Sequence, residues 1–150
     1  MNHTESSIQL RKSNDLDAKQ VHKLICLLEN ENLDLEMFTQ MFSGNVRDPR
    51  NIYLVAEENG LIVGFISCHS QVLLHHLDIV YEIQEMFVDE HFRGKGLGRQ
   101  LLENLQNEIQ LRKGKYLEVS SNKLRDQAHE FYQLAGFNRT HYKFTKNLNA

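Results

Sequence analysis

Several features are scarce in this chain of 150 residues, and each absence narrows what the chain can be. One Pro and 8 Gly are too few for a collagen-like or low-complexity protein. The two cysteines, Cys26 and Cys68, lie far apart and predict neither a disulfide framework nor a metal or redox motif. No apolar run is long enough to span a membrane, and residues 1–10 carry no apolar secretory segment or lipidation signal. We therefore expect a cytoplasmic protein with no membrane partner.

The chain also lacks an excess of positive charge. It has 17 Lys and Arg against 20 Asp and Glu, which gives a net charge of −3. Domains that bind nucleic acid are typically basic, so we expect no nucleic acid as a partner. The rest of the composition, 41% hydrophobic and 25% charged residues, is ordinary for a globular protein. A chain of this length is expected to form one domain over residues 1–150 around its own core.

The spacing of apolar residues predicts a mixed α+β domain. Apolar residues within 21–28 recur at helical spacing, and Asn59-Gly60 between two alternating runs is typical of a β-hairpin turn. The expected order is β-α-α-β-β-β-α-β-α-β-β around one central mixed sheet. Strands are expected at 7–12, 52–56, 61–72, 78–88 and 116–120, with one or two more in 137–148. Helices are expected from about residue 16 and at 34–42, 96–111 and 127–135, and the helix at 96–111 connects two parallel strands.

A glycine-rich turn before the longest predicted helix is the sharpest local feature. It runs Arg93-Gly94-Lys95-Gly96-Leu97-Gly98-Arg99. Its three glycines leave successive backbone N–H groups uncovered at a helix N-terminus, where the helix dipole favours an anion. Its three cations add positive charge, so a pyrophosphate suits the turn, although the glycines could serve packing alone. The turn lacks the Lys-Ser/Thr ending of a P-loop and does not match G-x-G-x-x-G.

The spacing Arg93-x-x-Gly96-x-Gly98 resembles the Q/R-x-x-G-x-G/A signature of the GCN5-related N-acetyltransferases (GNAT). The resemblance extends over nearly the whole chain. Shorter runs are similar to the bacterial aminoalkylphosphonate N-acetyltransferases. The runs that carry the two similarities are Glu85-Met86-Phe87-Val88, Asn122, Phe131-Tyr132-x-x-x-Gly136-Phe137, Asn45-Val46-Arg47-Asp48-Pro49, Leu74-His75-His76, Glu82-Ile83-Gln84-Glu85, Ser120-Ser121-Asn122 and His141-Tyr142-Lys143-Phe144-Thr145-Lys146.

The resemblance implies a single GNAT-like domain that uses acetyl-CoA as cosubstrate. The backbone of residues 94–99 would hold the pyrophosphate, the end of the strand at 78–88 would pair with the pantetheine arm, and a backbone N–H there would polarise the thioester carbonyl. The cofactor-binding residues implied are Met86, Phe87, Val88, Arg93, Gly94, Lys95, Gly96, Leu97, Gly98, Arg99 and Asn122.

Three residues are candidates for the proton transfers. By resemblance, Tyr132 would be the general acid that protonates the leaving thiolate, since a phenol has a pKa near ~10, although its place on an apolar stripe also fits a core residue. Glu85, and after it Glu82, would bind or deprotonate the amine, because carboxylates are unusual in so apolar a strand. Residues three apart face opposite sides of a regular strand, and a bulge between them would change this. An ordinary salt-bridged carboxylate is the alternative.

The acceptor is expected to be a small primary amine that attacks acetyl-CoA directly, with an aminoalkylphosphonate preferred. Arg47 and Arg50 flank a Pro turn and could pair with a phosphonate, although loop arginines are often only solvated. His76 is a third candidate for the substrate site. His75 and His76 would point to opposite faces of a strand, so no metal site is predicted, although His76 or Asp78 could contribute to one.

Two alternatives to this function stay open. One is an acetyltransferase for another amine: a polyamine, an amino sugar or a protein N-terminus. The other is a regulatory module that binds CoA without catalysis. Residues 141–146 would line the acceptor cleft or a dimer interface, and a homodimer is expected because dimers are frequent in the family that the chain resembles.

Overall fold

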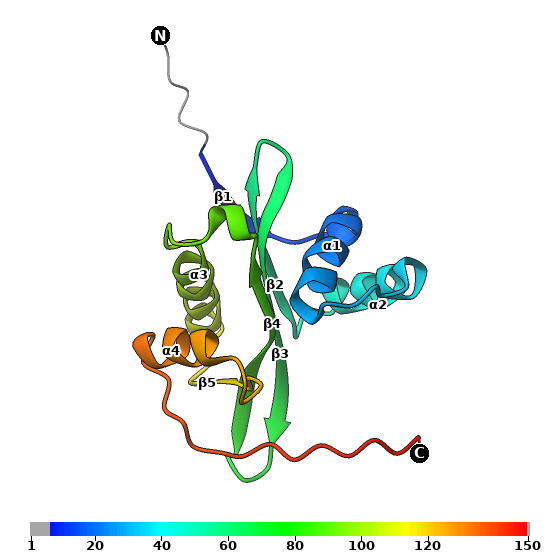
Figure 1. The fold of residues 1–150 in the computed structure, drawn as a ribbon. Helices are drawn as coiled ribbons and strands as arrows, with labels where there is room; N and C mark the ends of the chain where they lie inside the picture. Colours follow the sequence, from blue (N-terminus) through cyan, green and yellow to red (C-terminus); the bar gives the residue numbers. More distant parts are fainter. Residues whose placement is uncertain (1–6, 150) are drawn as a thin grey trace.

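A five-stranded sheet separates two layers of helices in the computed structural model, which describes residues 7–149. Helices α1 and α2 cover one face, and α3 and α4 lie on the other (Figure 1). The strand order is β1-β2-β3-β4-β5, antiparallel from β1 to β4 and parallel between β4 and β5. The elements are β1 (Gln9–Lys12), α1 (Ala18–Glu29), α2 (Leu35–Arg47), β2 (Ile52–Glu58), β3 (Leu61–Leu73), β4 (Asp78–Val88), α3 (Leu97–Leu111), β5 (Tyr116–Val119) and α4 (Asp126–Leu134).

The mixed sheet and the parallel β4-α3-β5 unit agree with the prediction. The hairpin turn between β2 and β3 does too, because Asn59 and Gly60 have φ of 50° and 80°, the two positive values that a type I′ turn requires. The longest helix, α3, has 15 residues. Within residues 7–149, no helix combines the length and the apolar character needed to cross a membrane.

Each face of the sheet has its own apolar core. Ile66, Leu101 and Leu105 are fully buried in the core beneath α3, and Val55 and Phe65 lie in the core beneath α1 and α2. Full burial of such a side chain stabilises the fold by about 1.5–3 kcal/mol. Since alternate residues of β2 and β3 supply the two cores, polar residues that interrupt this alternation are conspicuous.

Helix α2 is longer than predicted. The sequence suggested a break at Ser43-Gly44, but the helix continues to Arg47. Gly44 is exposed, and a glycine in a helix costs only about 1 kcal/mol relative to alanine. Phe42 on one side of the glycine and Val46 on the other both pack against the core beneath α1 and α2. This packing stabilises the helical conformation on both sides of Gly44, so the helix does not end there.

The predicted strands in 137–148 are wrong. No residue after α4 within the described part of the chain belongs to a strand, so the observed order ends with β5 and α4. The alternation that suggested a strand is real, but its apolar members, Tyr142, Phe144 and Leu148, are 89%, 93% and 84% exposed. A strand needs a neighbour for its backbone hydrogen bonds, and this segment passes along the lower edge of the molecule (Figure 1) without joining the sheet.

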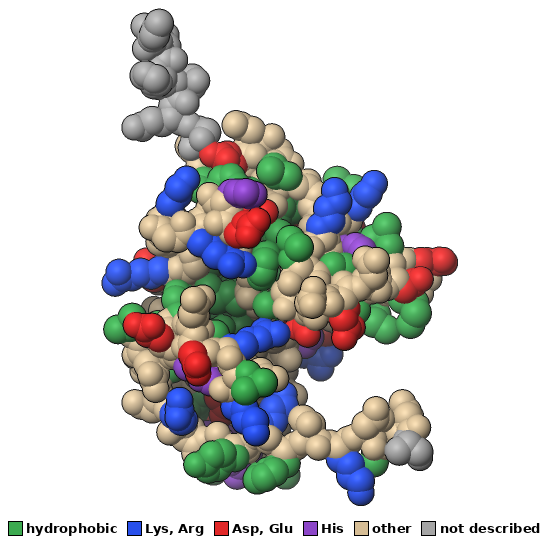
Figure 2. All heavy atoms as spheres, viewed as in Figure 1, with side chains coloured by type: hydrophobic (Ala, Val, Ile, Leu, Met, Phe, Trp, Pro, Cys, Tyr) green, Lys and Arg blue, Asp and Glu red, His purple; other side chains and the backbone are tan. Residues whose placement is uncertain are grey.

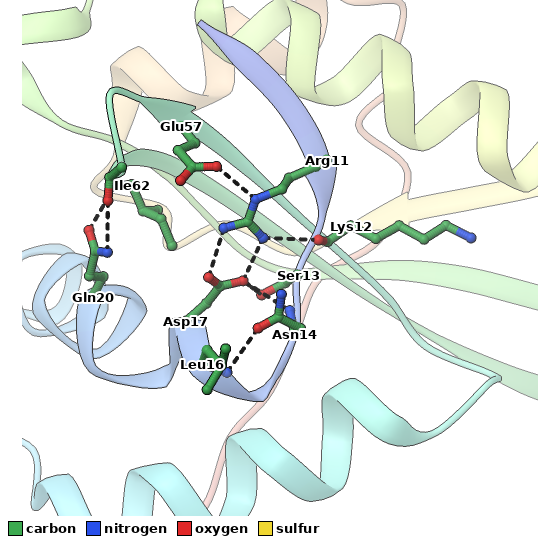
Figure 3. Close-up of polar contacts among 10 residues, drawn as sticks. Arg11, Lys12, Ser13, Asn14, Leu16, Asp17, Gln20, Glu57 and Ile62 are labelled. Carbon is green, nitrogen blue, oxygen red and sulfur yellow. Dashed lines mark hydrogen bonds and ion pairs between the residues drawn. The ribbon is translucent and has the colours of Figure 1, made fainter.

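A largely buried ion pair joins β1 to the start of α1 and to β2 (Figure 3). Arg11 donates to both carboxylate oxygens of Asp17, at 2.8 and 2.9 Å, and to Glu57 of β2 at 2.9 Å. Asp17 is 5% exposed and also accepts hydrogen bonds from Ser13 and Asn14. Burial raises the pKa of Asp17, but these hydrogen bonds outweigh it and hold the pKa below its usual range.

Candidate functional site

The glycine-rich turn connects β4 to the N-terminus of α3. Gly94 and Gly96 have φ of +76° and +78°, a region that residues with a Cβ rarely adopt. The first helical hydrogen bond is donated by the N–H of Gln100 to Gly96 O, at 3.0 Å. The N–H groups of residues 97–99 therefore lie in the first turn of α3, where the helix offers them no acceptor. Together with the helix dipole they make a site that fits a pyrophosphate.

Gly98 allows this first turn to lie close to β4 and α4. A Cβ at position 98 would stand 3.2 Å from Met86 Cε and 3.7 Å from the ring of Phe131. An alanine there would be tight against the end of the Met86 side chain and in ordinary contact with the Phe131 ring. The glycine therefore brings three elements together: the anion-binding turn, the end of β4 and the aromatic side of α4.

Arg93 turns back onto β4 and away from the N–H groups. Its Nε donates to Val88 O at 2.9 Å, and its guanidinium lies 5.0 Å from the centroid of the Phe87 ring. A cation over an aromatic face is attracted by the ring. In this position Arg93 fixes the end of β4 relative to the turn.

The other two cations of the turn are exposed. The ammonium of Lys95 lies 5.6 Å from the centroid of the Phe92 ring, and Arg99 pairs with Glu103 one helical turn away, at 3.3 Å. Exposed pairs of this kind hold a side chain only weakly. Lys95 and Arg99 are therefore free to turn toward an anion bound at the start of α3.

β4 and β5 separate at the end that lies nearest the turn. Their parallel pairing runs from Val80 with Tyr116 to Ile83 with Val119, whereas β4 continues to Val88. Within residues 7–149, the segment 84–88 of β4 thus has no strand on the side away from β3. An open strand edge can pair with an extended ligand. The predicted pantetheine-binding residues 86–88 lie on this segment.

Tyr132 reaches the same segment from α4. Its hydroxyl donates to Met86 Sδ at 3.8 Å, and its ring packs edge-on against Phe131 and Phe137. Burial raises the pKa of Tyr132, so the phenol keeps its proton at neutral pH. The two interpretations of Tyr132 are compatible, because the ring is part of the core while the hydroxyl lies at β4.

Asn122 lies in the turn that follows β5 and leads into α4. Its Oδ1 accepts a hydrogen bond from the N–H of Leu124 at 2.9 Å, and its backbone oxygen accepts one from the N–H of Arg125 at 3.0 Å. The side-chain oxygen thus shapes the turn before α4. The exposed amide nitrogen is the part of Asn122 that can donate to a ligand.

A bulge in β4 places Glu82 and Glu85 on the same face of the sheet. Glu82 pairs with His69 and Glu85 pairs with Ser67, while Gln84 has no partner on β3. Directly paired residues of neighbouring strands share a face, and residues two apart on a strand do as well. Both carboxylates therefore face the side of α1 and α2. The three-residue spacing in the sequence does not show whether the two carboxylates share a face. The unpaired residue Gln84 puts them on the same face.

These carboxylates belong to a polar cluster formed by Tyr53, Ser67, His69, Glu82 and Glu85. Ser67 is fully buried; its hydroxyl donates to the carboxylate of Glu85 and accepts from the N–H of Glu85 at 3.0 Å. The hydroxyl of Tyr53 lies 2.7 Å from Nε2 of His69, and the two rings are stacked. Burial, and then the charge of Glu85, raises the pKa of Tyr53.

Sequence reasoning did not select Tyr53, Ser67 or His69. No motif marks them; Tyr53 and Ser67 each lie between apolar residues in the chain, and His69 follows Cys68 and precedes Ser70. The available signal was the alternation along β3, in which Ser67 and His69 continue the face of the buried Phe65. Two polar residues on a core-facing row indicate a site once the neighbouring strands are known.

Arg50 lies at the edge of the polar cluster. Its guanidinium pairs with Asp48 at 2.7 Å, and its backbone oxygen accepts a hydrogen bond from Ser70, the residue after His69. Hydrogen bonds from Arg50 lower the pKa of Asp48 to about 2, and the charge of His69 acts in the same direction. Arg50 thus brings a guanidinium, paired with Asp48, to the place where the cluster meets solvent.

Arg47 and His76 lie outside the polar cluster. Arg47 pairs with Asp15 ahead of α1, at 2.6 Å. His76 lies in the turn between β3 and β4, four residue pairs beyond the pair that includes His69, and its ring contacts Tyr116. No group of three or more His, Cys, Asp or Glu among the described residues is arranged to hold a metal ion.

Three members of the polar cluster, His69, Glu82 and Glu85, are half-buried. Figure 2 shows an open gap below α2, between that helix and the C-terminal segment. The polar cluster lies on the sheet face that α1 and α2 cover only in part, and Tyr132 lies on the opposite face. The segment 84–88 of β4 separates the two.

Comparison with known proteins adds three findings. The family model of the acetyltransferase (GNAT) domain matches residues 49–139. An aminoalkylphosphonate N-acetyltransferase of Salmonella typhimurium is 39% identical over 140 residues, which cover 93% of this chain and 91% of that protein. An N-acetylaspartate synthetase of Danio rerio is 27% identical over 77% of this chain and 38% of its own length.

Solved structures share the fold at low sequence identity. An aminoglycoside N-acetyltransferase in complex with CoA superposes with a TM-score of 0.86 at 15% identity and full coverage of both chains. A transcriptional regulator from Bacillus halodurans C-125 gives a TM-score of 0.85 at 19% identity, covering 95% of this chain and all of that one.

Proposed function

Given that the chain belongs to the GNAT acetyltransferase family, we propose that it acetylates the primary amine of an aminoalkylphosphonate. Transfer of an acetyl group from acetyl-CoA to an amine is the activity of the family. The choice of acceptor is supported by the relative from Salmonella typhimurium, which has that activity. It is also supported by the charges around the polar cluster.

The observation that carries the proposal is the separation of charge across the polar cluster. The carboxylates of Glu82 and Glu85 lie within it, and the guanidinium of Arg50 lies at its edge. An aminoalkylphosphonate has an ammonium at one end and an anion at the other. Such a molecule fits with its amine toward the carboxylates and its phosphonate toward Arg50, because guanidinium pairs bidentately with such anions.

The reaction then proceeds by direct attack. The amine nitrogen, after losing a proton to Glu85, attacks the thioester carbonyl carbon. The new C–N bond forms as the C–S bond breaks, and Tyr132 protonates the leaving thiolate and regains a proton from the acylated nitrogen. One proton is released overall, together with the amide and the free thiol of CoA. A protonated phenol beside β4 suits this role.

Arg50→Ala tests the acceptor. In a thiol-release assay across a panel of amines, we expect the parent to turn over aminoalkylphosphonates fastest. Arg50→Ala should raise KM for the phosphonate by about 10-fold or more, because charged hydrogen bonds contribute about 1.5–3 kcal/mol. The KM for the matched alkylamine without the phosphonate should hardly change.

Arg47→Ala is the matched control, since Arg47 pairs with Asp15 outside the polar cluster and should leave both KM values as in the parent. Turnover of a polyamine, an amino sugar or a protein N-terminus in preference to phosphonates would replace the proposed acceptor. Tight binding of CoA without turnover of any amine would indicate the regulatory module instead.

We also propose that the enzyme is a cytoplasmic homodimer. The dimer is supported by the exposed apolar side chains of the C-terminal segment, which a second copy would cover. Fractionation of the native cells would test the location.

A further inference from the structure

The turn that carries Arg50 is bound by a residue from the opposite side of the sheet. Arg112 directly follows α3, and its Nη1 donates to the backbone oxygen of Pro49 at 2.8 Å, across 63 positions of the chain. Helix α3 lies on the other face of the sheet from α1 and α2 (Figure 1). The contact therefore joins the end of the helix that starts at the glycine-rich turn to the turn proposed to bind the acceptor.

The two peptide groups on either side of the Arg50 Cα atom are each hydrogen-bonded at both ends. The oxygen of the first belongs to Pro49 and accepts from Arg112. Its N–H belongs to Arg50 and donates to Asp48 Oδ1 at 2.9 Å. In the second, the oxygen accepts from Ser70 Oγ at 2.9 Å and the N–H donates to Asp48 O at 3.0 Å. Because peptide groups are planar, these bonds together fix the backbone of Arg50.

Two of these four hydrogen bonds come from outside the turn. The two bonds to Asp48 are local and would form whichever way the turn pointed. Ser70 lies on β3 directly after His69, so its bond places the turn beside the polar cluster. Arg112 binds the same turn from the end of α3. The two outside bonds therefore determine where the turn lies relative to the sheet.

The guanidinium of Arg112 is itself fixed. Its Nε and Nη2 both lie 3.5 Å from Oε1 of Glu108, one helical turn earlier, while Nη1 faces Pro49. Its side chain is 29% exposed, whereas that of Lys12, which pairs with the same carboxylate, is 71% exposed. A planar guanidinium can bind a carboxylate on one edge and a carbonyl oxygen on another, which the compact ammonium of a lysine cannot do in a fixed geometry.

Asp48 orients the guanidinium of Arg50 and leaves donors for an anion. The Asp48 carboxylate accepts from Nε at 3.1 Å and from Nη2 at 2.7 Å, and the Arg50 side chain is 77% exposed. A guanidinium has five N–H donors, so Nη1 and the second N–H of Nη2 can still bind a phosphonate bidentately. An arginine on a mobile turn would lose conformational freedom on binding, and this loss would weaken the complex. A turn that is already fixed avoids much of it.

We propose that Arg112 positions Arg50 for the phosphonate of the acceptor and thereby favours aminoalkylphosphonates over simple alkylamines. Arg112 acts through the turn and is a positioning residue. The inference rests on the proposed function, because it takes Arg50 as the group that binds the phosphonate. It extends that function by naming a residue outside the site on which selectivity for the anion depends.

Arg112→Gln tests the positioning, because the shorter, neutral side chain loses the bond to Pro49. In the thiol-release assay, we expect KM for the aminoalkylphosphonate to rise about 3- to 10-fold, which corresponds to the net contribution of one hydrogen bond. The value of kcat and the KM for the matched alkylamine should stay as in the parent. Arg112→Lys, which keeps a cationic donor, should give a smaller rise. Ser70→Ala removes the other outside bond and should raise the same KM.

Lys12→Gln is the matched control, since it removes the other cation from Glu108 and leaves the contact with Pro49 intact. In an Arg50→Ala background, Arg112→Gln should raise the phosphonate KM no further, because no guanidinium is left to position. A parent-like phosphonate KM in Arg112→Gln would overturn the inference. An equal loss with the phosphonate and the alkylamine would overturn it too, since that pattern indicates a structural role alone.

A measurement without turnover separates this inference from the proposed function. In the free enzyme, the 15N NMR signals of the Arg50 and Asn51 amides should shift in Arg112→Gln and stay in place in Lys12→Gln. Unchanged signals in Arg112→Gln would overturn the inference whatever the acceptor is. If the signals shift but Arg50→Ala leaves the phosphonate KM unchanged, the proposed acceptor is wrong, while the contact between Arg112 and the turn is confirmed.

Discussion

The hydroxyl of Tyr132 and the carboxylate of Glu85 approach β4 from opposite faces of the sheet. Tyr132 contacts Met86 from the face of α3 and α4, whereas Glu85 lies with Ser67 on the face of α1 and α2. The gap between β4 and β5 connects the two faces. In the proposed reaction, this placement would let the amine enter on one side of the sheet and the thiolate leave on the other.

Tyr132→Phe should lower kcat at least 100-fold while the Kd for acetyl-CoA stays nearly unchanged. General acids contribute about 10²–10⁴-fold, and a phenylalanine ring retains the packing against Phe131 and Phe137. Because burial raises the pKa of Tyr132, the fall in rate that its ionisation causes should begin only above about pH 10 in the parent. Single-turnover rates and calorimetry measure both quantities.

The exposed Tyr142→Phe is the control for this change. Unchanged turnover in Tyr132→Phe, or a loss explained entirely by weaker binding of acetyl-CoA, would contradict the assignment of Tyr132 as the acid.

Single residues were predictable from the sequence where a motif marks them. The motif marks Tyr132 and the turn glycines by their spacing, and Glu85 stands out as a carboxylate in an apolar strand; the roles of these residues stay predictions. Tyr53 and His69 come from strands whose pairing decides which residues meet, and that pairing is a property of three strands together. A polar residue in an apolar run could be noticed, but its partners could not be named.

At the scale of elements, β1 is held by charge as much as by its short pairing with β2. Arg11 connects β1 to Asp17 ahead of α1 and to Glu57 of β2 (Figure 3). Few apolar contacts are available to a strand of four residues. The ion pair therefore fixes the direction in which the chain enters α1.

Asp17→Asn should lower the free energy of unfolding by about 1.5–3 kcal/mol at pH 7, because it removes the charged partner of Arg11 from a buried site. The folded-state pKa of Asp17 lies below its unfolded value of about 3.9. The carboxylate thus contributes its stability fully above about pH 5, and the contribution is lost as pH falls through the folded-state pKa.

Urea unfolding at several pH values checks this prediction. The stability of Asp17→Asn should fall less between pH 7 and pH 3 than that of the parent, and the exposed Asp126→Asn should follow the parent. Parallel pH curves for Asp17→Asn and the parent would contradict the role given to this ion pair.

Elements were predictable where local periodicity and packing agree. The helix α3 and the hairpin of β2 and β3 follow from their patterns. The last strands failed because alternation in 137–148 describes one apolar face, while a strand also requires a hydrogen-bonding neighbour. That neighbour is not encoded in the segment itself.

At the scale of the whole molecule, the C-terminal segment leaves large apolar side chains in solvent. Tyr142, Phe144 and Leu148 are among the most exposed apolar residues described, and the turn between β3 and β4 adds Leu74 and Leu77. Apolar area that leaves water contributes about 25 cal/mol per Å². A second copy of the chain that covers this surface would account for the predicted homodimer.

Sedimentation equilibrium should therefore give the mass of two chains for the parent. Tyr142→Lys combined with Phe144→Glu should shift the protein to the mass of one chain, without a change in the circular dichroism spectrum. The matched control combines Leu16→Lys with Leu111→Glu, exposed apolar residues outside this surface. A parent that sediments as a monomer at micromolar concentration would contradict the dimer.

Because of the bulge at Gln84, the arrangement of the site depends on the number of residues between Glu82 and Glu85 as much as on the identity of the side chains. Loss of this one residue would shift the register of β4 and turn either Glu82 or Glu85 toward the opposite core, with every proposed catalytic residue still present in the sequence. A relative that carries both glutamates but is one residue shorter between them would have the same residue types without both carboxylates on one face of the sheet. Gaps at this position are therefore as informative as substitutions when the chemistry of related chains is inferred.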